Sequence, residues 1–280
     1  PSKNIFEKND LDLASRIFES FKLIKSEQQK KSDLYRPSSM WQDHIDNDFS
    51  FMKKSFEDNN LESFLFFLQN FGNWDKYLGI ENQTYIKNYS KNFFLKRFLS
   101  DEIFYGQMML WKYFSQSKNI KSLNLPRFGN QNGAYIDENF VVLGSFFTDI
   151  YAKTVKNILK KSSENIIVDL GGGYGRFGYY TLKDTYNNCF VDIDIPENLA
   201  LASYYLSKCF PDKKNFFYGE NKFSIETLKN YDLIFLPPWE IENIPDNSTQ
   251  VVINTNSLGE MEPMVAKNYL KHIHRISKYF

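Results

Sequence analysis

The sequence of 280 residues predicts an α/β protein in which a doubly wound parallel sheet follows an all-helical N-terminal region. Three observations predict this class. Apolar residues recur at helical spacing through 10–118, and short β-branched runs alternate with helical patterns from residue 165 onward. A glycine-rich segment, IIVDLGGGYGRFGYY at 166–180, joins the first of these strands to a helix. We therefore expect a helical region at 1–122 and an α/β region at 123–280.

The N-terminal region is predicted to be a series of amphipathic helices. Apolar residues keep helical spacing over 45–56, two asparagines at 59–60 interrupt the pattern, and 61–68 resumes it. Two further helical patterns cover 85–98 and 103–114. Lysines and arginines between the apolar positions are typical of solvated helix faces rather than of a binding stripe. We expect this region to act as a lid or substrate platform for the rest of the chain.

The second region is predicted to begin with a hairpin and a helix before strands and helices alternate. The hairpin runs from Tyr135 to Val142 around DEN, and the helix covers 145–161. The later strands and helices are NIIVDL, a helix after Gly175, NCFVDID, a helix from Pro196 to Lys208, DLIFL, QVVINT and a helix from Pro263 to Lys278. In sheets of this kind ligands bind at the carboxyl ends of the strands.

Composition excludes several classes of partner. Lys plus Arg and Asp plus Glu number 34 each, so the formal net charge is zero and no global field would attract nucleic acid or an anionic membrane. The two cysteines, Cys189 and Cys209, have no metal-ligand or redox spacing, which favours a reducing compartment. The richest apolar run, FLFFL at 64–68, is too short to span a bilayer. We expect a cytoplasmic protein without a transmembrane segment and without a nucleic-acid partner.

The glycine-rich loop fits some nucleotide-type ligands better than others. A phosphate-binding P-loop needs Lys and Ser or Thr after its last glycine, but Arg176 and Phe177 follow Gly175 here. The dinucleotide fingerprint GxGxxG is matched letter for letter by Gly173, Gly175 and Gly178. Spacing alone therefore leaves a dinucleotide site, another cofactor site and a purely structural turn open.

The acid at the end of the first strand favours S-adenosylmethionine among these ligands. Asp169 begins the pattern Asp-x-Gly-x-Gly-x-Gly, which continues through Gly171, Gly173 and Gly175. A carboxylate beside the loop would repel a pyrophosphate in a partly desolvated site. It would attract an ammonium or a sulfonium group, and S-adenosylmethionine carries both and no phosphate. We therefore predict that Asp169 and these three glycines bind this cofactor.

The second and third strands supply candidates for the nucleoside half of the cofactor. The second strand ends in Asp192 and Asp194, and Asp194 lies 19 residues after Gly175, where an acid reaches the ribose hydroxyls of either cofactor. Alternatively, Asp194 is only an acid near the start of the next helix, favoured by its dipole. We predict that Asp194 binds the ribose.

The loop after DLIFL is predicted to surround the adenine. Trp239 could stack on the base and Glu240 could accept a hydrogen bond from its exocyclic amine, although a core position fits Trp239 equally well. In an alternative register NFFYGE is the third strand, and Glu220 is then the adenine-side acid.

The loop after QVVINT is the predicted place of the chemistry. Methyl transfer to a hydroxyl requires an aligned acceptor and a base that takes its proton. We predict Glu260 as that base, Asn256 as the residue that orients the acceptor, and Asn254 as a further cofactor-binding residue. The alternative is structural, because Ser257 and Glu260 have the spacing of a capping box before the helix that starts near Pro263.

No metal site is predicted. His272 and His274 lie two positions apart on a predicted helix and so face different sides, unlike the i, i+4 pair that binds a metal. His44 lies in the helical region and is expected to be a surface histidine. Packing or surface roles are favoured for all three, although His272 or His274 could act as a base if it faced the cleft.

Several motifs taken together resemble the sugar O-methyltransferases of bacterial gene clusters for surface polysaccharides. The resemblance covers roughly residues 125–280, with weaker similarity before them. It rests on GNQNGAYID, IVDLGGGYGRFGYY, DIDIPENLALASYYLSKCFP, FFYGEN, LPPWEIENIPDNS, NTNSLGEM and YLKHIHRISKYF, of which IPENLALASYYLS and NSLGEM are the most distinctive. It implies a Rossmann-like class I S-adenosylmethionine fold and a sugar hydroxyl, on a polysaccharide or its precursor, as the acceptor.

The resemblance also implies a seven-stranded sheet that the sequence does not complete. If QVVINT is the fourth strand, KYF at 278–280 begins the fifth, and we expect the C-terminal strands to be truncated or the sheet to be completed in another way. The function expected is S-adenosylmethionine-dependent O-methylation of a sugar. The alternatives are an NAD-dependent sugar oxidoreductase and a cofactor-binding interaction protein without catalytic activity.

Overall fold

The computed structural model describes residues 7–73, 93–115, 119–160, 165–185 and 188–280. Its first part is helical, as predicted. The elements of this part are α1 (Lys8–Gln28), η1 (Asp33–Tyr35), α2 (Ser39–Asn47), α3 (Ser50–Glu57), α4 (Leu61–Asn70), η2 (Phe71–Asn73), α6 (Phe93–Ser115) and η3 (Ile120–Leu123), where η marks a 3-10 helix.

Two predicted helix boundaries in this part were wrong. The pattern over 45–56 is divided between α2 and α3, because the amides of Asp48 and Phe49 both bond to the carbonyl of His44 and end the first helix. The patterns at 85–98 and 103–114 were expected to be two helices. Residues 74–92 lie outside the described residues, and α6 continues from 93 to 115 because no proline or glycine stands between the two patterns to end it.

The second part contains the predicted parallel sheet. Six strands lie in the order β5-β6-β4-β3-β7-β8, and every pair of neighbours is parallel. The central strands are buried along their length except at Ile166, the partly exposed first residue of β3, as continuous apolar runs predict. The strands are β3 (Ile166–Leu170), β4 (Cys189–Ile193), β5 (Asn215–Phe217), β6 (Leu233–Leu236), β7 (Thr249–Ile253) and β8 (Ser277–Tyr279).

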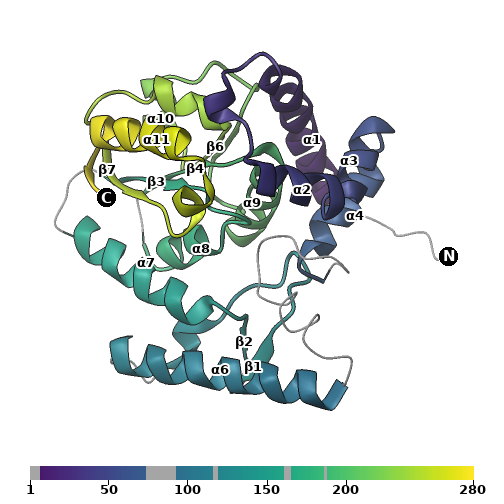
Figure 1. Ribbon diagram of the computed structural model, residues 1–280, viewed down its shortest axis with the longest axis vertical. Helices are drawn as coiled ribbons and strands as arrows, with labels where there is room; N and C mark the ends of the chain where they lie inside the picture. Colours follow the sequence, from purple (N-terminus) through teal and green to yellow (C-terminus); the bar gives the residue numbers. More distant parts are fainter. Residues whose placement is uncertain (1–6, 74–92, 116–118, 161–164, 186–187) are drawn as a thin grey trace.

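Helices cover both faces of this sheet. Figure 1 shows α10 and α11 on one side of the strands and α8 and α9 on the other, while α7 lies against α8. The chain passes from β3 to β4 on one side and later adds β7 on the other side of β3, so a crevice opens at the carboxyl ends of β3 and β7. The helices of this part are α7 (Ser145–Leu159), α8 (Arg176–Leu182), α9 (Pro196–Cys209), α10 (Ile225–Asn230), η4 (Pro238–Asn243), η5 (Ser257–Glu260) and α11 (Pro263–Ile276).

Strand order decides between the two registers left open above. The strand DLIFL forms β6 and pairs with β4, whereas NFF of NFFYGE forms β5 at the sheet edge. The first-choice register, with DLIFL beside the second strand, is therefore confirmed. The predicted strand near KYF is also present as β8 beside β7. The predicted hairpin is formed by β1 (Ala134–Ile136) and β2 (Asn139–Val141).

The N-terminal helices pack directly on the α/β part. Helix α1 lies against α9 and α4, and one apolar cluster contains Phe18 and Phe64 together with Phe190 and Leu206. The boundary at residue 122 stays a prediction. None of the helices that the structure describes has the length and apolar character that a bilayer crossing requires.

Candidate functional site

A cavity of about 470 Å³ lies at the carboxyl edge of the sheet, over the crevice between β3 and β7. One part of its wall is formed by the glycine-rich loop, the end of β4, Pro238 and the loop after β7. The other part comes from η1, the start of α2, α6, α7 and the start of α8. Segments more than 200 residues apart in the sequence therefore meet around one space of ligand size.

The glycine-rich loop lies along the wall of this cavity. Gly171 and Gly173 line it, whereas Gly175 does not and is instead the N-cap residue of α8. A Cβ at Gly171 would lie 2.2 Å from the hydroxyl oxygen of Ser257, so this loop can approach the loop after β7 only with glycine there. A Cβ at Gly173 would meet no protein atom within 4 Å. The backbone at Gly173 is thus open toward the cavity.

Three buried carboxyl groups lie behind the loop. Asp169 and Asp192 stand side by side on β3 and β4, and neither lines the cavity. Within the described residues, Oδ2 of Asp169 and both carboxyl oxygens of Asp192 have no hydrogen-bond partner. A Cβ at Gly172 would lie 2.8 Å from Oδ2 of Asp169 and 2.9 Å from Oδ1 of Asp192. The predicted loop acid is therefore one member of a pair of like groups beneath the loop.

Asp194 differs from this pair because it faces the cavity and has partners. It accepts hydrogen bonds from the amides of Gly173, at 2.9 Å, and Ile195, at 2.7 Å, and from Nδ2 of Asn198, at 3.3 Å. The structure thus places the residue predicted to bind the ribose at the cavity wall, where its carboxylate also holds the glycine-rich loop.

Burial raises the pKa values of all three acids, and repulsion within the group adds to this effect at Asp169 and Asp192. Burial, followed by the charge of Asp194, raises the pKa of Asp169 to about 8. Burial and the neighbouring Asp169 raise the pKa of Asp192 well above its usual range. Burial raises the pKa of Asp194 to about 7, although its hydrogen bonds favour the charged form. A cationic ligand near the loop would stabilise the ionised forms.

Replacement of Asp192 by asparagine should stabilise the folded protein at pH 8. The folded state binds more protons than the unfolded state between about pH 4 and pH 8, so stability falls as pH rises through this window. Removing one carboxyl group should restore on the order of 1–3 kcal/mol of the folding stability that is lost at pH 8. The difference in unfolding temperature between pH 6 and pH 8 should therefore be smaller in this variant than in the wild type.

The exposed Asp212→Asn variant is the control and should leave this difference unchanged. An Asp192→Asn variant that is less stable than wild type by the same amount at both pH values would contradict the repulsion between the acids.

The loop after β6 contributes less to the cavity than predicted. Pro238 lines the wall, but Trp239 lies in the core, where its ring is 6.2 Å from that of Tyr218 in an edge-to-face arrangement. Glu240 is buried and accepts a hydrogen bond from Nδ2 of Asn243. Glu220, the second-choice acid, forms an ion pair with Arg16 away from the cavity. The structure therefore gives Trp239 the core position that the sequence left open.

The loop after β7 places the predicted catalytic residues at the cavity. Asn256 and Glu260 line it, whereas Asn254 lies behind the wall. Nδ2 of Asn254 donates to the carbonyl of Leu170, at 2.7 Å, and Ser257 donates to the same carbonyl at 3.1 Å. These bonds fasten the loop after β7 to the end of β3.

The structural alternative for this loop, a capping box, is not formed. Helix α11 begins at Pro263 with Glu262 as its N-cap residue, and Ser257 bonds to Leu170 instead of capping it. The carboxylate of Glu260 is exposed and accepts a hydrogen bond from Nε1 of Trp41 at 2.9 Å. Glu260 is thus held by a residue from the N-terminal region.

Residues of η1 and α2 at the cavity were missed from the sequence. Tyr35 lines the cavity, and its hydroxyl lies 2.5 Å from Oε1 of Glu242. Nδ2 of Asn268 also donates to it, at 3.2 Å, and Nε2 of His272 lies 3.4 Å away. Burial, followed by the hydrogen bond to Glu242, raises the pKa of Tyr35 to about 12, so this hydroxyl stays protonated at neutral pH. The network fastens η1 to α11.

The histidines take structural positions in the part of the chain that the structure describes. His272 packs between Tyr35 and Arg275, and burial lowers its pKa, while His274 is exposed. His44 is half-buried rather than fully at the surface, and its Nδ1 lies 2.6 Å from Oδ2 of Asp48. No group of three or more potential metal ligands occurs among the described residues.

Comparisons of the chain with protein-family models, with curated proteins and with solved structures gave no match. The chemistry that the cavity can perform therefore has to be inferred from its own residues. It combines an open glycine backbone, an acid that faces the cavity, buried acids behind the glycine-rich loop and an exposed carboxylate on the loop after β7. The glycine backbone and the acids suit a cationic nucleoside ligand. The exposed carboxylate could accept a proton from a second substrate.

Proposed function

We propose that the protein is an S-adenosylmethionine-dependent O-methyltransferase with a Rossmann-like class I fold, and that its acceptor is a sugar hydroxyl. The observation that carries this proposal is the pair of buried acids, Asp169 and Asp192, which stand side by side beneath a glycine-rich loop. Ammonium and sulfonium groups near this pair would stabilise its ionised form, whereas a pyrophosphate would be repelled by it.

The residues at the loop fit such a cofactor. Gly171 and Gly173 would bring backbone close to its amino-acid end, because the space beside Gly173 holds no protein atom within 4 Å. Asp194 would accept hydrogen bonds from the ribose hydroxyls, and Pro238 would lie on the adenine side. When bound, the cofactor supplies an electrophilic methyl group.

The loop after β7 supplies the groups for an acceptor alcohol. Glu260 would take the proton of the hydroxyl as the new bond to carbon forms, and Asn256 would orient that hydroxyl. The acceptor hydroxyl would thus find its base and its orienting residue on the same loop. The resemblance of residues 125–280 to sugar O-methyltransferases supports the choice of a sugar.

A screen for methyl transfer tests this function directly. The protein is incubated with S-adenosylmethionine and a panel of free sugars, nucleotide sugars and bacterial glycans, and each product is examined by mass spectrometry. We expect the mass increment of one methyl group on at least one sugar, together with release of S-adenosylhomocysteine. Oxidation of a sugar with NAD, and no methylation, would instead favour the oxidoreductase.

Replacement of Gly173 by alanine should lower the affinity for S-adenosylhomocysteine about tenfold or more while the fold is kept. Within the protein the added methyl group has free space, so stability should change only by the strain of φ +62°, about 1–2 kcal/mol. A ligand on this backbone would meet the methyl group directly. Calorimetry gives the affinity and thermal unfolding gives the stability.

The control for this variant is Gly259→Ala, because a Cβ there also meets nothing within 4 Å and Gly259 does not line the cavity. It should bind as tightly as wild type. Equal affinity in both variants would show that the cofactor does not lie against Gly173.

A further inference from the structure

The wall of the cavity opposite the glycine-rich loop contains an aromatic residue that reaches the predicted base. Trp41, in the first turns of α2, lines the cavity, and its indole Nε1 donates to Oε2 of Glu260 at 2.9 Å. Within the described residues this is the one hydrogen bond of the Glu260 carboxylate, so its Oε1 is left for another donor. The ring of Trp41 is half-buried.

The position of Trp41 is fixed by local contacts of α2. Ser38 caps the helix, and its hydroxyl accepts a hydrogen bond from the amide of Trp41 at 3.4 Å. The ring of His44 packs beside the indole, with centroids 5.5 Å apart, and His44 is itself held by Asp48 at 2.6 Å. The indole is therefore oriented by its own helix before any ligand enters.

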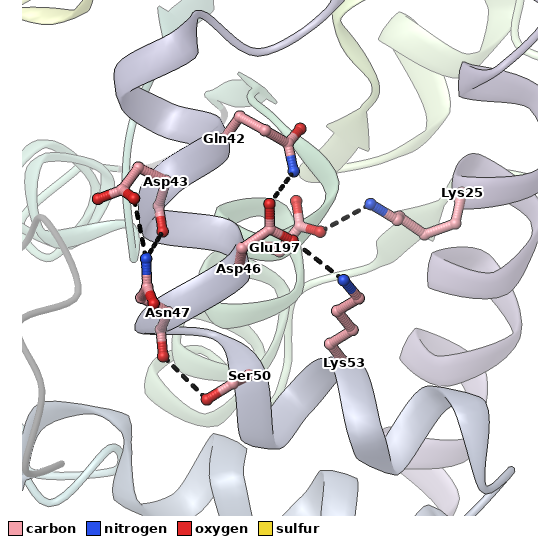
Figure 2. Close-up of polar contacts among 8 residues, drawn as sticks. All are labelled: Lys25, Gln42, Asp43, Asp46, Asn47, Ser50, Lys53 and Glu197. Atoms are coloured by element: carbon pink, nitrogen blue, oxygen red, sulfur yellow. Dashed lines mark hydrogen bonds and ion pairs between the residues drawn. The ribbon is translucent and has the colours of Figure 1, made fainter.

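Helix α2 is in turn anchored on its exposed side. Figure 2 shows Asp46 between Gln42 and Lys53: Nε2 of Gln42 donates to it at 2.9 Å and Nζ of Lys53 at 3.0 Å. These bonds join α2 to α3. Exposed contacts of this kind contribute little stability each, but they restrict how α2 can turn relative to the cavity.

We propose that Trp41 is a positioning residue of the acceptor site. Its indole N–H holds one oxygen of Glu260 so that the other meets the acceptor hydroxyl, and its ring is the surface on which the sugar ring packs. A pyranose has apolar C–H faces and a polar hydroxyl edge, which matches an aromatic ring beside a carboxylate. This proposal rests on the methyltransferase function proposed above and adds that the N-terminal region supplies part of the acceptor site.

The contact between ring and sugar can be tested by saturation-transfer NMR on protein that is saturated with S-adenosylhomocysteine. The probe is a mixture of the methyl glycosides of glucose, galactose, mannose, rhamnose and fucose. Wild type should transfer saturation to ring C–H protons of at least one glycoside. Trp41→Ala should weaken this transfer about tenfold, whereas Trp41→Phe, which keeps an aromatic ring, should retain most of it.

The hydrogen bond to Glu260 is tested by kinetics with the glycoside that gives the strongest transfer. Because a hydrogen bond to a charged group contributes about 1.5–3 kcal/mol, Trp41→Phe should lower kcat about 10- to 100-fold and change KM less than about threefold. Met40→Ala is the control, since Met40 lies beside Trp41 on α2, is exposed and does not line the cavity. It should behave as wild type in both experiments.

The outcomes separate this proposal from the function on which it rests. Failure to bind S-adenosylhomocysteine overturns the methyltransferase itself. Binding of that ligand without saturation transfer to any glycoside, or with equal transfer in Trp41→Ala, overturns the sugar-packing role of Trp41 alone. An unchanged kcat in Trp41→Phe overturns its role in positioning Glu260.

Discussion

Replacement of Glu260 by glutamine should lower the rate of methyl transfer by about 10²- to 10⁴-fold, the usual contribution of a general base. The amide has nearly the shape of the carboxylate and still offers an oxygen to the indole of Trp41, which now lies 2.9 Å from Oε2. It cannot take the proton of the acceptor. The affinity for S-adenosylhomocysteine should remain within about twofold of wild type, since Glu260 lies on the loop after β7 and not on the glycine-rich loop.

Glu262→Gln is the matched control for this experiment. Glu262 is an exposed glutamate two positions away that does not line the cavity, so its replacement should leave turnover unchanged. Turnover measured with labelled S-adenosylmethionine compares the two variants. Unchanged turnover in Glu260→Gln would remove Glu260 from the mechanism.

Replacement of Asp194 by asparagine should lower the affinity for S-adenosylhomocysteine by about 10- to 100-fold. Hydrogen bonds from hydroxyls to a charged carboxylate contribute roughly 1.5–3 kcal/mol, and the neutral amide of asparagine accepts less strongly. Asp194 is the acid of the three that lines the cavity. Calorimetric titration measures the loss, with the exposed Asp212→Asn variant as the control.

The same residue predicts a pH dependence of binding. Burial raises the pKa of Asp194 to about 7, so the carboxylate of the unliganded protein becomes protonated as pH falls through 7. The affinity of wild type for S-adenosylhomocysteine should therefore fall between pH 8 and pH 6, while Asp194→Asn should bind almost independently of pH. Equal pH dependence in both proteins would show that Asp194 does not bind the nucleoside.

Local sequence patterns predicted most of the elements and their order. Alternating β-branched runs and helical patterns located β3, β4, β6 and β7, because buried parallel strands are apolar along their length. Periodicity could not locate the break between α2 and α3, since the buried Phe49 keeps the helical spacing across the turn. Nor could it place β5 at the edge, because strand order depends on which strands pair over long distances.

The site residues likewise fall into those that local patterns predicted and those that depend on contacts between distant parts of the sequence. Gly171, Gly173 and Asp194 were predicted because their spacing after two strands is a local signal, and the structure places all three at the cavity. Trp41 and Tyr35 were missed because they lie about 200 residues from the residues they contact, on helices without a motif. The core position of Trp239 depends on Tyr218, which a reading of the loop alone cannot reveal.

The most direct test of the central claim is calorimetric titration of the protein with S-adenosylhomocysteine and, separately, with NAD. The acids Asp169, Asp192 and Asp194 around the glycine-rich loop predict saturable binding of S-adenosylhomocysteine and no heat of binding with NAD. Tight binding of NAD without binding of S-adenosylhomocysteine would contradict the proposed methyltransferase.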